Sequence, residues 1–151
     1  MELQFRELCL SNIQGLLYEA ESNNSFLPYK AKPNQTISLL MSMFAEIEGF
    51  RIYGFTDNKG EVCSFIVLLT DGNSLDIGPM YVREDLRGLG LGKTQVQKAI
   101  NNYKPSVINA RTWSGNLASQ KIFAEFGFEI VELIEDDRIN GDSTLFYRCK
   151  L

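Results

Sequence analysis

The chain has 151 residues, of which 44% are hydrophobic and 23% charged, so its length fits one folded domain and its composition excludes global disorder. Its net charge of −4 argues against a nucleic-acid partner, and no run approaches the roughly 18 apolar residues that cross a membrane. Because histidine is absent and the three cysteines have no ligand spacing, we expect no metal site, no histidine-dependent nucleophile and a cytoplasmic protein.

Apolar spacing in the first half of the chain predicts a strand, two helices and two further strands. The first strand covers residues 3–8, and Ser11 caps the helix that follows. A second helix is predicted near residues 33–48. The period then changes to two, which predicts strands over 50–57 and 61–70 that flank the turn "NKG".

The second half predicts alternating strands and helices that end in a hairpin. A strand over 74–82 leads into a helix over 89–103, and a strand over 106–112 leads into a helix that Asn116 caps. Two strands follow, over 128–136 and 143–150. The order β-α-α-β-β-β-α-β-α-β-β predicts one α/β (α+β) domain over residues 1–151, with a mixed, mostly antiparallel twisted sheet flanked by helices.

The stretch RGLGLGKT, residues 87–94, predicts a phosphate-binding loop where a strand meets a helix. Glycine allows close backbone approach, and the amides and dipole of a helix start favour an anion. A Walker A loop would need glycine at position 87, and a dinucleotide fingerprint would need it at 93 or 95. Both are excluded, which leaves another phosphate cradle or a turn that serves packing alone.

The spacing that the loop does fit is Q/R-x-x-G-x-G/A, through Arg87, Gly90 and Gly92. With "IGPMYV" before it and "NLASQKIFAEFGF" after it, this motif resembles the GNAT superfamily of acetyl-CoA-dependent N-acetyltransferases. The resemblance covers most of the chain and is strongest over residues 75–128. It implies the GNAT-type acyl-CoA N-acyltransferase fold, whose fourth strand separates from the fifth, and acetyl-CoA (coenzyme A) as co-substrate.

The same resemblance implies a set of cofactor contacts. Loop amides would bind the pyrophosphate, a backbone amide of the fourth strand would polarise the thioester carbonyl, and the asparagine-headed helix would contact the pantetheine arm and the phosphates. The implied cofactor-binding residues are Met80, Tyr81, Val82, Arg87, Gly88, Leu89, Gly90, Leu91, Gly92, Lys93, Asn116, Ser119 and Phe123.

Asp76 is the candidate catalytic base, and the alternative is a solvated residue that starts a strand. Counting by two places Asp76 on the same strand face as Met80. For the acid, the family's usual tyrosine position holds Phe123, which has no proton to donate. Tyr81 is the candidate substitute acid, with Tyr147 as a second, although packing roles suit both. Deprotonation through water, with no dedicated base, also stays open.

Two functions follow as hypotheses. The first is an enzyme that transfers an acetyl group from acetyl-CoA to a primary amine of a small molecule or peptide, by direct attack in a ternary complex. The alternative is a non-catalytic module that binds coenzyme A or an acyl-CoA as a sensor or partner domain. Phe123 favours the alternative, whereas Asp76 and the glycine loop favour the enzyme.

The acceptor is expected to meet residues 23–50 and the hairpin over 136–142. Aromatic side chains there would line a pocket, and carboxylates would attract an amine: Phe26, Tyr29 and Tyr53, and Asp136, Asp137 and Asp142. The alternative is that these residues have structural roles only, with the aromatic side chains in the core and the carboxylates on a polar hairpin. The resemblance also implies a homodimer that pairs through terminal strands, with the 143–150 strand as the expected edge.

Overall fold

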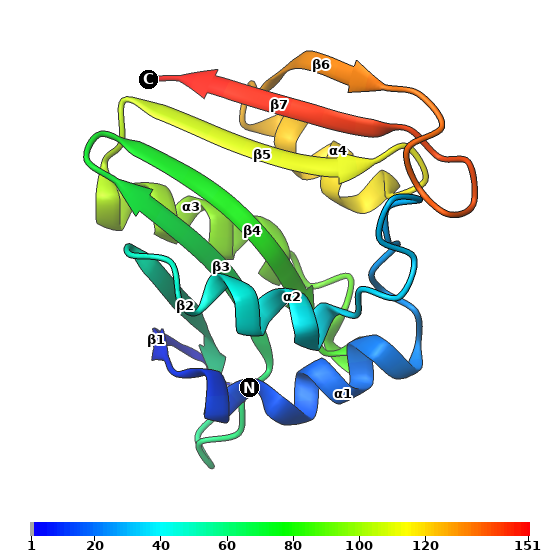
Figure 1. Ribbon diagram of the computed structural model, residues 1–151. Coiled ribbons are helices and arrows are strands. Elements are labelled where there is room, and N and C mark those ends of the chain that lie inside the picture. Colours follow the sequence, from blue (N-terminus) through cyan, green and yellow to red (C-terminus); the bar gives the residue numbers. More distant parts are fainter. Residues whose placement is uncertain (1) are drawn as a thin grey trace.

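Seven strands form one sheet in the order β1-β2-β3-β4-β5-β7-β6 across residues 2–151, the part of the chain that this computed structural model describes (Figure 1). Neighbouring strands are antiparallel except β4 and β5, which are parallel. The strands are β1 (Gln4–Leu8), β2 (Phe50–Thr56), β3 (Ser64–Asp71), β4 (Ser74–Val82), β5 (Val107–Trp113), β6 (Glu129–Ile134) and β7 (Thr144–Lys150).

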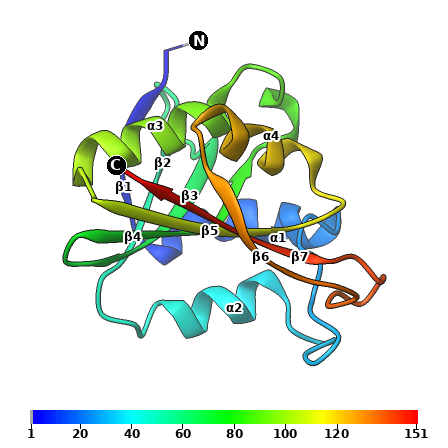
Figure 2. The same cartoon turned by 90° about the horizontal axis from the view of Figure 1, so that it is seen from above.

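Helices cover both faces of the sheet (Figure 2). On one face lie α1 (Gln14–Ser22), which follows a 3-10 turn, and α2 (Ile37–Phe44). On the other lie α3 (Leu91–Tyr103) and α4 (Leu117–Glu125). The predicted element order and the mixed, mostly antiparallel sheet are therefore confirmed. Within residues 2–151, no helix is both long and apolar enough to cross a bilayer.

Three helices begin later than predicted. Ser11 lies inside the 3-10 turn Leu10–Ile13, whose N-cap is Cys9, so it caps no helix and α1 begins only at Gln14. The other two differences also have local causes. α2 begins at Ile37 rather than near residue 33, because the Thr36 side chain caps it by accepting a hydrogen bond from the Leu39 amide. α3 begins at Leu91 rather than at residue 89. The preceding Gly90 has a left-handed backbone with a φ of 78°, which a helix cannot include.

The strand β7 is not the edge strand that the sequence predicted. It lies between β5 and β6, so its backbone is paired on both sides. The edge is β6, whose six residues are all exposed. A homodimer stays a prediction, and pairing at this end of the sheet would involve β6.

Each face of the sheet has its own core. Residues on the α3/α4 face include Leu68, Leu75, Val96, Ile108 and Phe123. Residues on the α1/α2 face include Leu17, Met41, Ile52, Val67 and Tyr81. Successive residues of a strand point to opposite faces. A strand residue that belongs to one core therefore shows that its two chain neighbours point to the other face.

The pairing of β4 with β5 covers only half of β4. Residues 74–77 pair with residues 107–110, and beyond them the two parallel strands part (Figure 1). The second half of β4 is therefore bonded to β3 alone. The separation that the family resemblance implied is present, and it opens between residues 78–82 and the end of β5.

A β-bulge in β4 changes which face its residues point to. Ile66 of β3 opposes Met80, whereas Leu68 opposes Ile77, so β4 has one extra residue at Gly78–Pro79. Ile77 and Met80 consequently both contact the α3/α4 core, although three positions separate them. The prediction that Asp76 and Met80 share a face is wrong, because Asp76 precedes the bulge and points to the α1/α2 face.

Candidate functional site

The loop between β4 and α3 presents a row of unused backbone amides. Within residues 2–151, the N–H groups from Leu89 to Lys93 have no acceptor, and the first bond of α3 runs from Thr94 to the Gly90 carbonyl, 3.0 Å away. Gly88 and Gly90 hold left-handed φ angles of 83° and 78°. Free amides that converge at a helix start form an anion site, so this loop has the donors that a diphosphate requires.

The start of α3 is packed closely on α4. A Cβ at Gly92 would lie 3.2 Å from Cδ1 of Ile122, so glycine permits this approach. Lys93 Nζ lies 2.9 Å from a carboxylate oxygen of Glu125, and this hydrogen bond lowers the pKa of Glu125. Of the predicted phosphate-binding cations, Lys93 thus already has a carboxylate partner on α4.

Arg87 ties the loop to the end of β4. Its Nε donates to the Val82 carbonyl at 3.2 Å, and its guanidinium lies 5.1 Å from the ring centroid of Tyr81. No carboxylate lies within 4.0 Å of its nitrogens among residues 2–151. Arg87 is therefore the loop cation whose charge is free for a phosphate.

The predicted residues of α4 lie on the α3/α4 face with the loop. Asn116 caps the helix through its oxygen, which accepts from the Ser119 amide at 3.3 Å. Ser119 is buried, and its hydroxyl is bonded to Thr112 at 2.7 Å and donates to the Asn116 carbonyl at 3.2 Å, so donation to a phosphate would require it to leave that carbonyl. Phe123 is buried against Phe128 and Tyr147. Burial also raises the pKa of Tyr147.

The Tyr81 side chain lies on the α1/α2 face, where the Arg87 guanidinium stacks on its ring. Its hydroxyl donates to Glu19 of α1 at 2.5 Å and accepts from Asn23 at 2.8 Å. Burial and the hydrogen bond to Glu19 raise the pKa of Tyr81. A hydroxyl already committed to a carboxylate, with a raised pKa, is poorly arranged to protonate a thiolate on the other face.

Asp76 lies at the closed end of the opening and on the α1/α2 face. It is exposed, and its carboxylate accepts a hydrogen bond from the Asn109 side chain of β5 at 2.9 Å. The Asn109 oxygen in turn accepts from Arg148 at 3.1 Å. The candidate base is thus held by a polar chain across three strands, on the face opposite the cradle.

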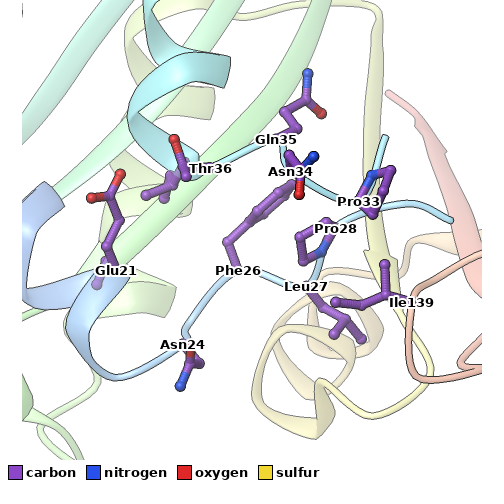
Figure 3. Close-up of a pocket in the computed structure, with 12 residues that line it drawn as sticks. Glu21, Asn24, Phe26, Leu27, Pro28, Pro33, Asn34, Gln35, Thr36 and Ile139 are labelled. Atoms are coloured by element: carbon purple, nitrogen blue, oxygen red, sulfur yellow. The ribbon is translucent and has the colours of Figure 1, made fainter. Parts of the chain in front are cut away.

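A pocket of about 520 Å³ opens between the end of α1, the start of α2 and the loop before β7 (Figure 3). Apolar side chains line much of it, including Phe26, Leu27, Pro28, Ile37 and Ile139. The Phe26 ring meets Trp113, the last residue of β5, edge to face at 6.2 Å between centroids. The pocket therefore lies beside the end of the strand that borders the opening.

Two of the three predicted pocket aromatics do not line this pocket. Tyr53 belongs to the other face, where it stacks on Phe5 at 5.5 Å and its hydroxyl is 3.0 Å from that of Tyr103. Strand β2 is apolar on both faces, so alternation could not say which one Tyr53 joins. Phe26 does line the pocket, whereas Tyr29 is not among its lining residues and instead forms a backbone bridge with Arg138.

The hairpin carboxylates expected to attract an amine are occupied by the protein itself. Asp136 pairs with Lys30, Asp137 accepts from the Thr144 hydroxyl at 2.6 Å, and Asp142 accepts from the Gly115 amide at 3.1 Å. Each carboxylate therefore braces the hairpin, as the polar-hairpin alternative expected, and attraction of an amine stays a prediction. Sequence reasoning also missed Glu19, which holds Tyr81, and Arg138, which is buried in this hairpin.

Comparison with known proteins identifies one matching family and many solved structures that have a similar fold. The chain matches the acetyltransferase (GNAT) family over residues 17–128. A comparison with curated protein sequences finds no significant match. Solved structures of similar fold are numerous, and three of them illustrate the range.

The ribosomal-protein-S18-alanine N-acetyltransferase from Escherichia coli superposes with a TM-score of 0.78 at 13% identity, covering 99% of this chain and 94% of that chain. A GNAT superfamily phosphinothricin acetyltransferase from Sinorhizobium meliloti, in complex with AcCoA, gives 0.76 at 16% identity, with 100% and 89% covered. An N-acetyltransferase from Staphylococcus aureus Mu50 gives 0.75 at 20% identity, with 99% of each chain covered. At these identities the likeness establishes the fold.

Proposed function

Because the chain belongs to the GNAT acetyltransferase family, we propose that it is an N-acetyltransferase that moves an acetyl group from acetyl-CoA to a primary amine by direct attack in a ternary complex. The observation that carries the proposal is the row of free amides from Leu89 to Lys93, beside the opening between β4 and β5. These donors suit the diphosphate of acetyl-CoA, and the opening suits its thioester arm.

Acetyl-CoA supplies a thioester whose carbonyl carbon the amine attacks. The C–N bond forms, the C–S bond breaks, the amine nitrogen loses a proton and the thiol is released. Residues 78–82 have no strand partner on their β5 side, so amides on that edge are free to donate to the thioester oxygen. We assign this role to the backbone of Met80–Val82, where a fixed donor stabilises the developing negative charge.

Asp76 is the proposed base because it lies on the face of the acceptor pocket. It lies four positions before Met80, about 13 Å of extended strand, so a water relay would carry the amine proton. For the thiol, Phe123 has no proton and the Tyr81 hydroxyl donates to Glu19. We therefore propose that coenzyme A leaves as the thiolate, without a side-chain acid, and becomes the thiol by taking a proton from water.

The acceptor amine belongs to a small molecule or a peptide. Two of the similar structures are named for such acceptors, phosphinothricin and the alanine of ribosomal protein S18. The pocket beside Trp113, lined by Phe26 and Ile139, is the proposed acceptor site, because it adjoins the opening on the face opposite the cradle.

One observation favours a second function, a module that binds coenzyme A or an acyl-CoA without turnover. It is the buried Phe123 at the position where the family usually has a tyrosine. Calorimetry with acetyl-CoA, followed by thiol release with a panel of amines in the same sample, separates the two. Binding with amine-dependent release supports the enzyme, binding without release supports the module, and no binding contradicts both.

A further inference from the structure

Arg138 is a buried cation with no ion-pair partner. Its side chain lies in the hairpin between β6 and β7 and is only 2% exposed. Nε donates to the Thr144 hydroxyl at 2.9 Å, and Nη1 donates to the Leu27 carbonyl at 2.6 Å. Within residues 2–151, Nη2 makes no hydrogen bond, and no carboxylate lies within 4.0 Å of the guanidinium. An indirect link runs from Arg138 through the Thr144 hydroxyl to Asp137.

A second arginine reaches the same tyrosine from the sheet. The Arg138 guanidinium lies 4.1 Å from the ring centroid of Tyr29, and Arg111 Nη1 donates to the Tyr29 hydroxyl at 3.2 Å. Burial lowers the pKa of Arg138, and the positive charge of Arg111 lowers it further. Tyr29, Asp137 and Asp142 act in the opposite direction and raise it. The two positive charges gather here although the chain as a whole carries −4.

Bracing the hairpin does not by itself require this charge. A buried cation without a carboxylate is costly, and buried charges in proteins are normally paired. Stacking on Tyr29 and on Trp113, whose ring centroid lies 5.2 Å away, offsets part of that cost. An anionic group bound at the free Nη2, with Arg111 beside it, would complete the pairing.

The position of Arg138 connects this charge to the acceptor pocket. Leu27, whose carbonyl Arg138 holds, and Ile139, its chain neighbour, both line the pocket (Figure 3). Trp113 ends β5 at the border of the opening. Since one carbon separates the amino and carboxyl groups of an α-amino acid, a carboxylate at Arg138 keeps the amine beside Trp113 and leaves the side chain to the apolar pocket.

We propose that Arg138 and Arg111 form an anion subsite and that the acceptor is an α-amino acid with an apolar side chain, whose carboxylate this subsite binds. The inference rests on the proposed acetyl transfer and narrows its acceptor. The sequence predicted that hairpin carboxylates attract the amine of the acceptor. In this proposal, arginines of the hairpin and the sheet instead bind the carboxylate of the acceptor.

The test compares amines that differ only in the carboxylate. Acetyl transfer is measured for leucine, methionine and phenylalanine, for their amides, and for the amines that lack the carboxyl group. We expect the free amino acids to have a kcat/KM at least about tenfold above both analogues, as the loss of a charge-assisted hydrogen bond implies. Arg111→Gln should reduce that ratio. Arg51→Gln, which removes an exposed arginine from β2, should leave it unchanged.

Binding measured without turnover keeps this proposal separate from the proposed function. Calorimetry with the same ligands on the CoA-loaded protein should show binding of an amino acid, which Arg111→Gln and Arg138→Lys weaken while acetyl-CoA affinity is retained. Equal kcat/KM for acids and amines would overturn the subsite and leave acetyl transfer standing. A preference for the amides, which mimic a peptide terminus, would also overturn it. So would the absence of amino-acid binding.

Discussion

Gly90→Ala tests the phosphate cradle most selectively, because the structure provides a matched control. Gly90 has a φ of 78°, and a Cβ there would have no atom within 4 Å. Gly60, in the β2–β3 turn, has a φ of 82° and the same open surroundings. Alanine at either position should cost about 1–2 kcal/mol of folding free energy, since L-residues are strained in this conformation. The melting temperature should fall by about 2–4 °C for each kcal/mol in a chain of this length.

Acetyl-CoA affinity should distinguish the two variants. At position 90, either the methyl group stands beside the free amides or the loop relaxes out of the left-handed conformation, and in both cases fewer amides converge on the diphosphate. Losing one charge-assisted hydrogen bond, about 1.5–3 kcal/mol, raises Kd about 10- to 100-fold. Gly60→Ala should bind as the wild type does, by calorimetry. Equal affinities for the two variants would refute the assignment of the cradle.

Three further predictions concern the chemistry and the loop. Asp76→Asn keeps an oxygen for Asn109 but removes the charge, so the loss of turnover should shrink as pH rises and the amine deprotonates unaided; a constant ratio across pH would count against the base. Phe123→Tyr should leave coenzyme A affinity nearly unchanged. It should lower the folding free energy of the free protein by about 1–3 kcal/mol, because the buried hydroxyl would lack a hydrogen-bond partner. Thermal melts with and without coenzyme A measure both effects. Lys93 lowers the pKa of Glu125, so their contact stabilises the fold fully above the ordinary pKa of a glutamate, about 4.3, and this stabilisation is lost as pH falls through the lowered pKa. The stability difference between wild type and Lys93→Met, measured in urea melts, should therefore vanish below that pH range. A difference that persists there would contradict the pairing.

Much of the fold could be predicted because its local signals agree with its tertiary structure. The bounds of β4 match the prediction at residues 74–82, and Gly60 of the predicted turn NKG adopts the left-handed conformation that glycine allows. The glycine loop was recognisable because its amides, charges and helix start are contiguous in sequence. The proposed pyrophosphate side of the site could therefore be located in the sequence from the glycine spacing together with the family resemblance.

The acceptor side could not be identified in this way because it depends on register and on distant contacts. The bulge at Gly78–Pro79 exists only relative to β3, and it reverses the face of Met80 with respect to Asp76. Arg138 lies among aspartates in a hairpin that reads as polar and exposed. It is buried because Tyr29 and Leu27, more than 100 positions earlier, pack and bond with it.

The measurement that tests the central claim most directly is release of the coenzyme A thiol from acetyl-CoA in the presence of apolar α-amino acids, with the product identified by mass spectrometry. We predict amine-dependent release and one acetyl group on the amino nitrogen, and both should be lost when Gly90→Ala weakens the cradle at limiting acetyl-CoA. Tight binding of acetyl-CoA without transfer to any amine would contradict the enzyme and leave the binding module in its place.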